Sequence, residues 1–77
     1  MEQMKLERIT FDPNIMAGKA CIRGMRIPVS VLLKLLAGGM THQEILSDYP
    51  DLEKQDIEQA IQYAALLADD RIVIRTS

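Results

Sequence analysis

Apolar residues recur at helical spacing in three separate stretches of the chain. In residues 29–37 the apolar positions 29, 32, 33 and 36 lie three or four residues apart, as on one face of a helix. A second, shorter stretch covers residues 42–48, and a third covers residues 54–68. In the third stretch one stripe persists for three turns: Ile57, Ala60, Ile61, Ala64 and Leu67. We therefore predict three helices whose stripes face a common core.

Local signals mark the ends of these predicted helices. Pro28 has a φ that suits the first turn of a helix, and the Gly38-Gly39 pair can close the same helix with a left-handed cap. Thr41 and Glu44 have the spacing of a capping box, in which each side chain accepts the other residue's backbone N–H. Pro50 disfavours helical backbone in the residue before it, so the second helix should end near residue 48.

Two short segments before the first helix have the character of β-strands. Residues 8–11 alternate with β-branched or aromatic side chains, and residues 20–22 are β-prone between the turn residues Gly18 and Gly24. Such short strands are not stable alone in water, so they must pack on the helices or pair with another chain. The pattern predicts one mainly α domain over residues 1–77: a strand and turn arm (1–28), a three-helix, helix-turn-helix-like unit (29–70) and a β-prone tail (71–77).

The small size of the chain points to an oligomer. A domain of 77 residues buries a small core, and its single cysteine, Cys21, excludes an internal disulfide. Val31 and Leu35 form a second apolar line on the first helix, apart from its core stripe. We expect an intertwined homodimer with Val31 and Leu35 at the interface and the strands pairing or packing across it.

Charge is distributed unevenly along the chain. Residues 1–38 carry six cations and three acids, whereas residues 39–77 carry three cations and eight acids, which gives a net charge of −2. This asymmetry suggests one face for an anionic partner and another for a cationic partner. Two merely solvated faces explain the same pattern, and charge alone leaves both interpretations open.

The basic cluster around the second strand is the candidate DNA contact. Lys19, Arg23 and Arg26 lie within eight residues that contain no acid, so they could bind phosphates. Arginines beside a turn also pair with acids, here for instance Asp12 or Asp48. The sequence leaves both interpretations open for the two arginines.

Catalysis is the function with the least support. We find no nucleophile with a base, no phosphate-binding loop and no metal-ligand set, because His42 and Cys21 alone are too few for zinc. His42 is expected to be a solvated or capping side chain, and Cys21 a packed strand residue. We therefore expect no catalytic residue, metal or cofactor.

No apolar run suggests a signal peptide or membrane span, and the single thiol suits the cytoplasm.

The motifs taken together resemble a known family. Residues 9–13, 18–29, 36–41 and 44–52 look like the small bacterial domain-of-unknown-function family 433, and the resemblance extends over residues 8–68. The chain departs from the family at Ala20, where proline is usual, at Met25, where threonine is usual, and at Glu53, which replaces a Ser or Thr helix cap. These departures affect local rigidity and capping.

The resemblance implies a homeodomain-like, dimeric protein similar to VapB-type antitoxins, which are encoded beside a PIN-like ribonuclease. It therefore suggests a protein that inhibits such a ribonuclease and autoregulates by binding DNA. The β-prone tail is the candidate partner contact, through Arg71, Ile72, Ile74 and Arg75, since an exposed strand can extend a partner's sheet. Alternatively the tail pairs within its own dimer, or the chain is an interaction module or DNA-binding regulator with no toxin partner.

Overall fold

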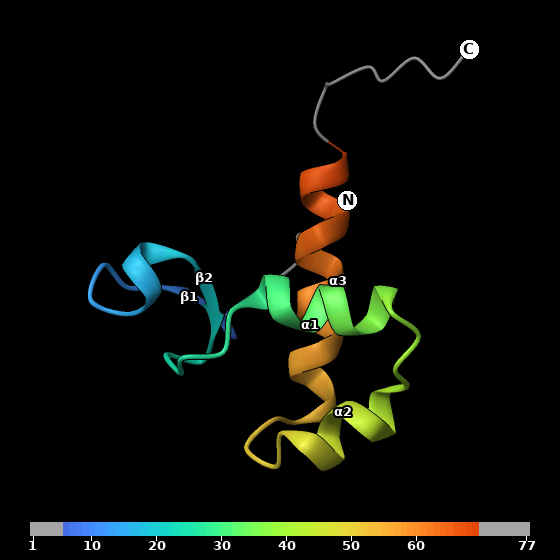
Figure 1. The fold of residues 1–77 in the computed structure, drawn as a ribbon. Coiled ribbons are helices and arrows are strands. Elements are labelled where there is room, and N and C mark those ends of the chain that lie inside the picture. The colour runs from blue at the N-terminus through green and yellow to red at the C-terminus, as the bar shows by residue number, and fades with distance from the viewer. Residues whose placement is uncertain (1–5, 70–77) are drawn as a thin grey trace.

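The computed structural model describes residues 6–69, which form a hairpin followed by three helices. The elements are the strand β1 (Ile9–Phe11), a short 3₁₀ turn (Met16–Gly18), the strand β2 (Ala20–Ile22), and the helices α1 (Val29–Ala37), α2 (His42–Asp48) and α3 (Lys54–Ala68) (Figure 1). The three helices have the bounds that the sequence predicts, and the mainly α architecture is confirmed. None of the described helices has both the length and the apolar character needed to cross a membrane.

The two strands form an antiparallel hairpin whose register places Ile9 opposite Ile22. After β2 the chain reverses through Arg23 and Gly24, which both have positive φ, at 46° and 71°. The Met25 N–H donates to the Ile22 carbonyl across this turn, at 2.8 Å. Positive φ is natural for glycine but unfavourable for arginine, so other contacts must hold Arg23 in place.

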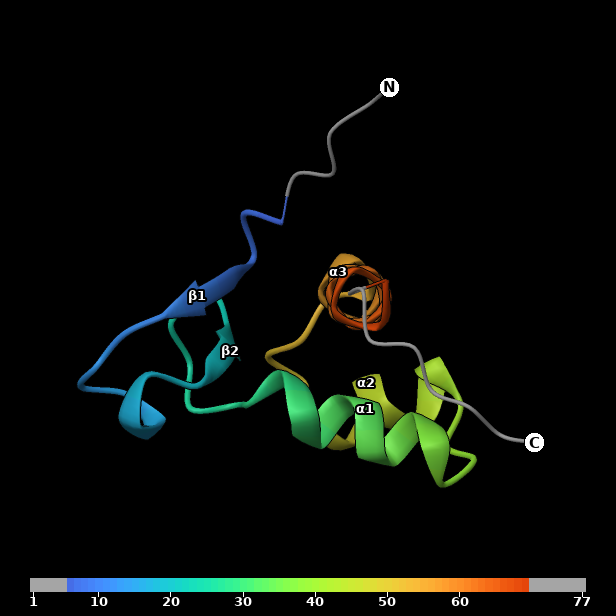
Figure 2. The ribbon, with the colours of Figure 1, turned by 90° about the horizontal axis from the view of Figure 1, so that it is seen from above.

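The helices form two layers. Seen along α3, helices α1 and α2 lie on the same side of it, and the hairpin lies beside α3 at the amino-terminal end of α1 (Figure 2). All five main elements and the turn before α3 contribute to one core, which consists of Ile9, Ile22, Val29, Leu32, Ile45, Leu52, Ile57 and Ala60. The hairpin is therefore stabilised by packing on the helices of its own chain.

The predicted helix ends are also observed. The Glu44 N–H donates to the Thr41 Oγ1 at 3.1 Å, and the Thr41 N–H donates to a Glu44 carboxylate oxygen at 2.8 Å, which completes the capping box. Gly39 follows α1 with a φ of +100°, the left-handed conformation that glycine tolerates. Leu52 is only 5% exposed and anchors the turn between α2 and α3.

The outer half of α3 differs from the prediction. Ile57 and Ala60, in its first half, are fully buried, but Ile61 is 41% exposed and Leu67 is 58% exposed. Figure 1 shows the reason: α3 continues past the point where α1 crosses it. The expectation that the whole stripe faces the core is wrong for this half, because periodicity identifies an apolar face but not a layer that covers it.

Candidate functional site

A fully buried carboxylate joins the hairpin to the start of α3. Asp56 Oδ1 accepts hydrogen bonds from Arg8 Nη1 at 2.9 Å and from Arg23 Nε at 3.0 Å. Its Oδ2 accepts from Arg23 Nη2 at 2.9 Å and from the Glu53 backbone N–H at 2.8 Å. This last bond caps α3, whose first backbone N–H groups have no partner within the helix. One side chain thus satisfies a helix end and binds two arginines.

These contacts determine the charge state of the cluster. Burial by itself raises the pKa of the Asp56 carboxyl, but hydrogen bonds from Arg23, the Glu53 N–H and Arg8 outweigh burial and hold this pKa below its usual value. The pKa of Arg23 is raised, chiefly by its hydrogen bonds to Asp56, and that of Arg8 is raised by its hydrogen bonds to Glu53 and Asp56. Asp56 is therefore an anion bound to two cations.

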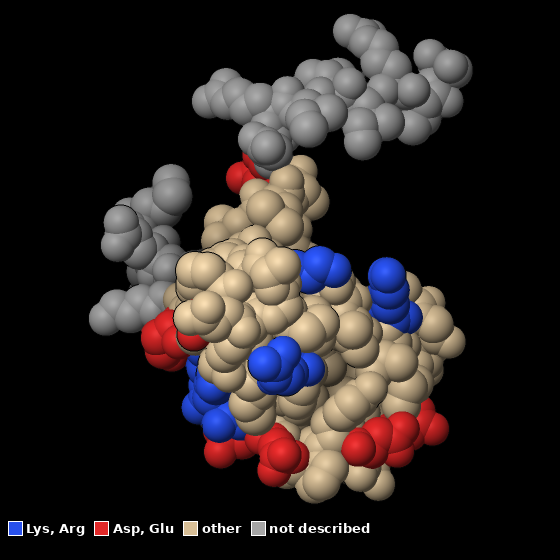
Figure 3. Space-filling view, turned by 60° about the vertical axis from the view of Figure 1, so that its left-hand side comes forward, with Lys and Arg blue, Asp and Glu red and all other residues tan. Residues whose placement is uncertain are grey.

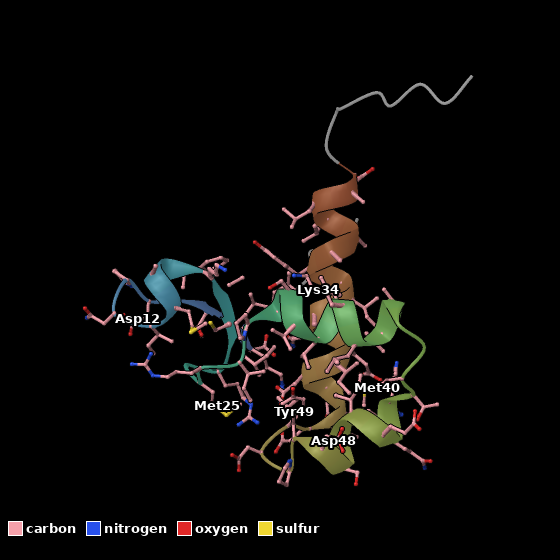
Figure 4. The ribbon with its side chains drawn as sticks, in the orientation of Figure 1. Asp12, Met25, Lys34, Met40, Asp48 and Tyr49 are labelled. Carbon is pink, nitrogen blue, oxygen red and sulfur yellow. The ribbon has the colours of Figure 1, made fainter. Side chains whose placement is uncertain are left out.

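For Arg23 the structure shows the acid-paired alternative. The partner is Asp56, and not Asp12 or Asp48, which lie on the hairpin loop and at the end of α2 (Figure 4). Arg23 Nη2 also donates to the Asp51 carbonyl at 2.6 Å. These bonds hold Arg23 in its left-handed backbone conformation. The sequence did contain one signal for this partner. Asp56 is the third residue of α3, and the cap residue of that helix is Glu53 in place of Ser or Thr, so an acid at this position was available to cap the helix and bind an arginine.

The other two candidate DNA contacts are arranged differently. Lys19 and Arg26 are exposed, and within residues 6–69 neither forms an ion pair or a side-chain hydrogen bond. On the face that carries the hairpin, basic side chains at the centre and upper right stand apart on uncharged surface, another at the lower left adjoins acidic side chains, and most acidic side chains lie towards the lower edge (Figure 3). Of the three predicted contacts, Arg23 is therefore bound to Asp56, whereas Lys19 and Arg26 have no such partner within residues 6–69.

The two residues predicted at the dimer interface are only partly exposed. Val31 and Leu35 are both half-buried on α1, and Leu35 also packs against the core of its own chain. Homodimer formation through these residues stays a prediction. The candidate partner contacts Arg71, Ile72, Ile74 and Arg75 lie outside the described residues.

The residues considered for catalysis or metal binding lie in different elements. Cys21 is buried in β2, 2% exposed, as expected of a packed strand residue, and His42 is exposed at the start of α2. In the described part of the chain, no three His, Cys, Asp or Glu side chains come together in a way that could hold a metal ion.

Sequence reasoning missed a groove between β2, α1 and the outer half of α3. It has a volume of about 440 Å³, and its apolar lining includes Val29, Leu33 and Leu67. Lys19 and Lys34 also line it, and Figure 4 shows Lys34 on α1 where this helix crosses α3. No local pattern predicts this groove, because it depends on where the hairpin sits against two helices.

The fold and the buried cluster define a class: small, mainly α domains in which an amino-terminal hairpin is attached to a three-helix unit. The family model described as "Protein of unknown function (DUF433)" matches residues 9–64, and the chain belongs to this family. A solved structure of a DUF433 member from Anabaena variabilis is similar, with a TM-score of 0.75 and 32% identity over 80% of this chain.

One curated relative is also similar. The protein y4eO of Sinorhizobium fredii, described as uncharacterized, is 33% identical over 58 residues, which is 75% of this chain. The present chain spans 26% of the length of y4eO and 61% of the Anabaena protein. The family is therefore assigned from the family model, and the Anabaena structure supports the fold.

Proposed function

We propose that this chain is an antitoxin-like protein that binds and inhibits a PIN-like ribonuclease, and that it acts by binding and not by catalysis. The observation that carries the proposal is the apolar surface on the outer half of α3. Leu66 is 47% exposed and Leu67 58% exposed. Phe11 of the hairpin, 59% exposed, lies against Tyr63 of the same helix, with ring centroids 6.1 Å apart. Neighbouring exposed apolar side chains on a small domain mark a surface that a partner covers.

The buried ionisable cluster supports a binding role. A general acid or base must reach the proton that it transfers. Asp56 is fully enclosed, and its oxygens accept hydrogen bonds from Arg8, Arg23 and the start of α3. It stabilises the fold and has no access to a substrate. The class of the partner comes from the resemblance to VapB-type antitoxins.

Co-expression with the product of the adjacent gene, which the proposal predicts to be the ribonuclease, tests the proposal. The ribonuclease alone should arrest growth of the host cells, and the full chain should restore growth. Leu67→Glu should abolish the rescue, because it places a charge on the apolar surface. Gln62→Glu adds the same charge at an exposed polar position of the same helix and is the matched control. A ribonuclease that is not toxic, or that stays toxic beside the full chain, would contradict the proposal.

A second candidate function is autoregulation through DNA binding by the dimer. Lys19 and Arg26 favour it, because both are exposed and unpaired within residues 6–69 and can therefore meet phosphates. Arg23 is not included among the proposed DNA contacts, since its guanidinium is hydrogen-bonded to Asp56. Helix-turn-helix binding, in which α3 would enter the DNA groove, is less favourable. The exposed Glu53 and Glu58 at the start of α3 would be repelled by the phosphates.

The salt dependence of DNA affinity tests this second function. Two protomers that each neutralise two phosphates should give a log–log salt slope of roughly −3.5. Arg26→Glu should flatten this slope, whereas Lys54→Glu at the start of α3 should change it less. Equal losses from both variants would favour reading by α3, and the absence of binding at low salt would remove the DNA function.

A further inference from the structure

The groove between β2, α1 and α3 combines apolar and cationic groups. Its lining includes aliphatic side chains of α1 and α3, Val29, Leu33 and Leu67, and Tyr63 adds a ring. The ring of Phe11 packs against Tyr63 and extends the apolar surface beyond the groove. The groove is therefore continuous with the exposed surface on the outer half of α3.

The cations of this groove are not neutralised within the described chain. Lys19 comes from the segment just before β2 and Lys34 from α1, and neither forms an ion pair with residues 6–69. Arg8 and Arg23 differ, because both are paired with Asp56. Two ammonium groups on an apolar groove complement a surface that carries both aliphatic side chains and carboxylates.

We infer that an acidic amphipathic helix of the partner protein occupies this groove, an inference that rests on the proposed function. An amphipathic helix places apolar side chains at intervals of three and four along one face, and such a face fits a groove between two helices. Carboxylates beside that face would meet Lys19 and Lys34. The apolar side chains would cover Leu33 and Leu67, which the chain itself leaves partly exposed.

Charge disfavours two other occupants. The tail after α3 carries Arg71 and Arg75 and lacks an acid after residue 70, so it would bring cations to a cationic groove. A second copy that presented the same groove would place its Lys19 and Lys34 near those of the first copy, and these like charges would repel one another. An acidic segment of a different protein has the complementary charge.

Charge reversal with a matched control tests the inference. Lys19→Glu combined with Lys34→Glu should weaken the complex with the adjacent-gene ribonuclease about tenfold or more, because it replaces attraction by repulsion. Lys54→Glu, at the far end of α3, makes the same kind of change outside the groove and should alter the dissociation constant less than about twofold. Lys19 and Lys34 are exposed, so the double variant should keep its helical circular dichroism.

Zero-length carbodiimide cross-linking gives the decisive readout, because it joins a lysine amine directly to a carboxylate. In the wild-type complex, Lys19 and Lys34 should couple to aspartate or glutamate residues of one helix of the ribonuclease. Cross-links between two copies of this chain at these lysines would overturn the inference. So would unchanged affinity of the double variant. A wild-type chain that does not bind the ribonuclease at all would instead refute the proposed function.

Discussion

Arg23 binds both carboxylate oxygens of Asp56, with Nε 3.0 Å from Oδ1 and Nη2 2.9 Å from Oδ2. The two residues are 33 positions apart, and their contact attaches the turn after β2 to the first turn of α3. Because the groove is formed between the hairpin and the helices, this attachment also fixes the position of Lys19 relative to Lys34. The ion pair between Arg23 and the buried Asp56 thus connects the stability of the fold to the surface on which the proposed partner binds.

Removal of the Asp56 carboxylate should destabilise the protein strongly. Asp56→Ala removes the helix cap of α3 and the buried carboxylate that Arg8 and Arg23 bind, and should lower the free energy of unfolding by about 2–4 kcal/mol. That loss is a large fraction of the stability of a small domain. Urea denaturation followed by circular dichroism measures it, and Glu58→Gln on the exposed side of α3 is the control. A loss below about 1 kcal/mol would show that the ion pair contributes little.

Stability should also fall in acid because of Asp56. The pKa of its carboxyl is lower in the folded than in the unfolded protein, so its contribution is complete above the unfolded value and is lost as pH falls through the folded value. Unfolding free energy measured against pH should therefore decline below about pH 4. The same curve for Asp56→Asn should be flatter in this range. Parallel curves for the two proteins would assign the acid sensitivity to other carboxylates.

The helices and their ends were predictable because their signals are local. The apolar spacing in residues 29–37, the capping box of Thr41 and Glu44, and Pro50 each act within a few residues. The strand β2 was likewise marked by its β-prone side chains between two turns. Such signals determine where an element begins and ends, whatever it packs against.

The candidate site was less predictable because it depends on distant contacts. Arg23 was recognised as a residue that either binds phosphate or pairs with an acid, but the choice of Asp56 depends on how the hairpin packs against α3. In the sequence Lys34 is only the single charge of residues 29–37, and its place in the same groove as Lys19 follows from the packing of the hairpin against the helices. The exposure of Leu67 depends on the absence of a covering layer within residues 6–69.

We predict that the protein is a homodimer through the second apolar line of α1. Light scattering behind a sizing column should give twice the 8.7 kDa mass of the chain. Val31→Glu should halve this mass, because it places an unpaired charge in the interface. Leu35→Glu should do the same, although Leu35 also packs on its own core, so Val31 is the cleaner position. Ala37→Glu, exposed on the same helix, is the control. A wild-type monomer that stays folded on dilution would contradict the prediction.

The tail after residue 70 should be needed for inhibition. We expect Ile72 and Ile74 to face one way in a strand added to the ribonuclease sheet, with Arg71 and Arg75 facing the other. Either arginine could then bind the carboxylates at the nuclease centre. A chain that ends at residue 70 should still bind the ribonuclease through the groove but should leave its activity largely intact. Equal inhibition by the shortened chain would place the inhibitory contact on the helices.

The central claim, that this chain inhibits a ribonuclease by binding it, is tested most directly by a titration. The purified product of the adjacent gene, predicted to be the ribonuclease, is mixed with increasing amounts of the full chain, and the cleavage of RNA is measured at each ratio. Ribonuclease activity should fall in proportion to the added chain and approach zero at a fixed molar ratio, because each ribonuclease molecule that is bound in the complex is inhibited. Ribonuclease activity that stays unchanged in excess chain would contradict the claim.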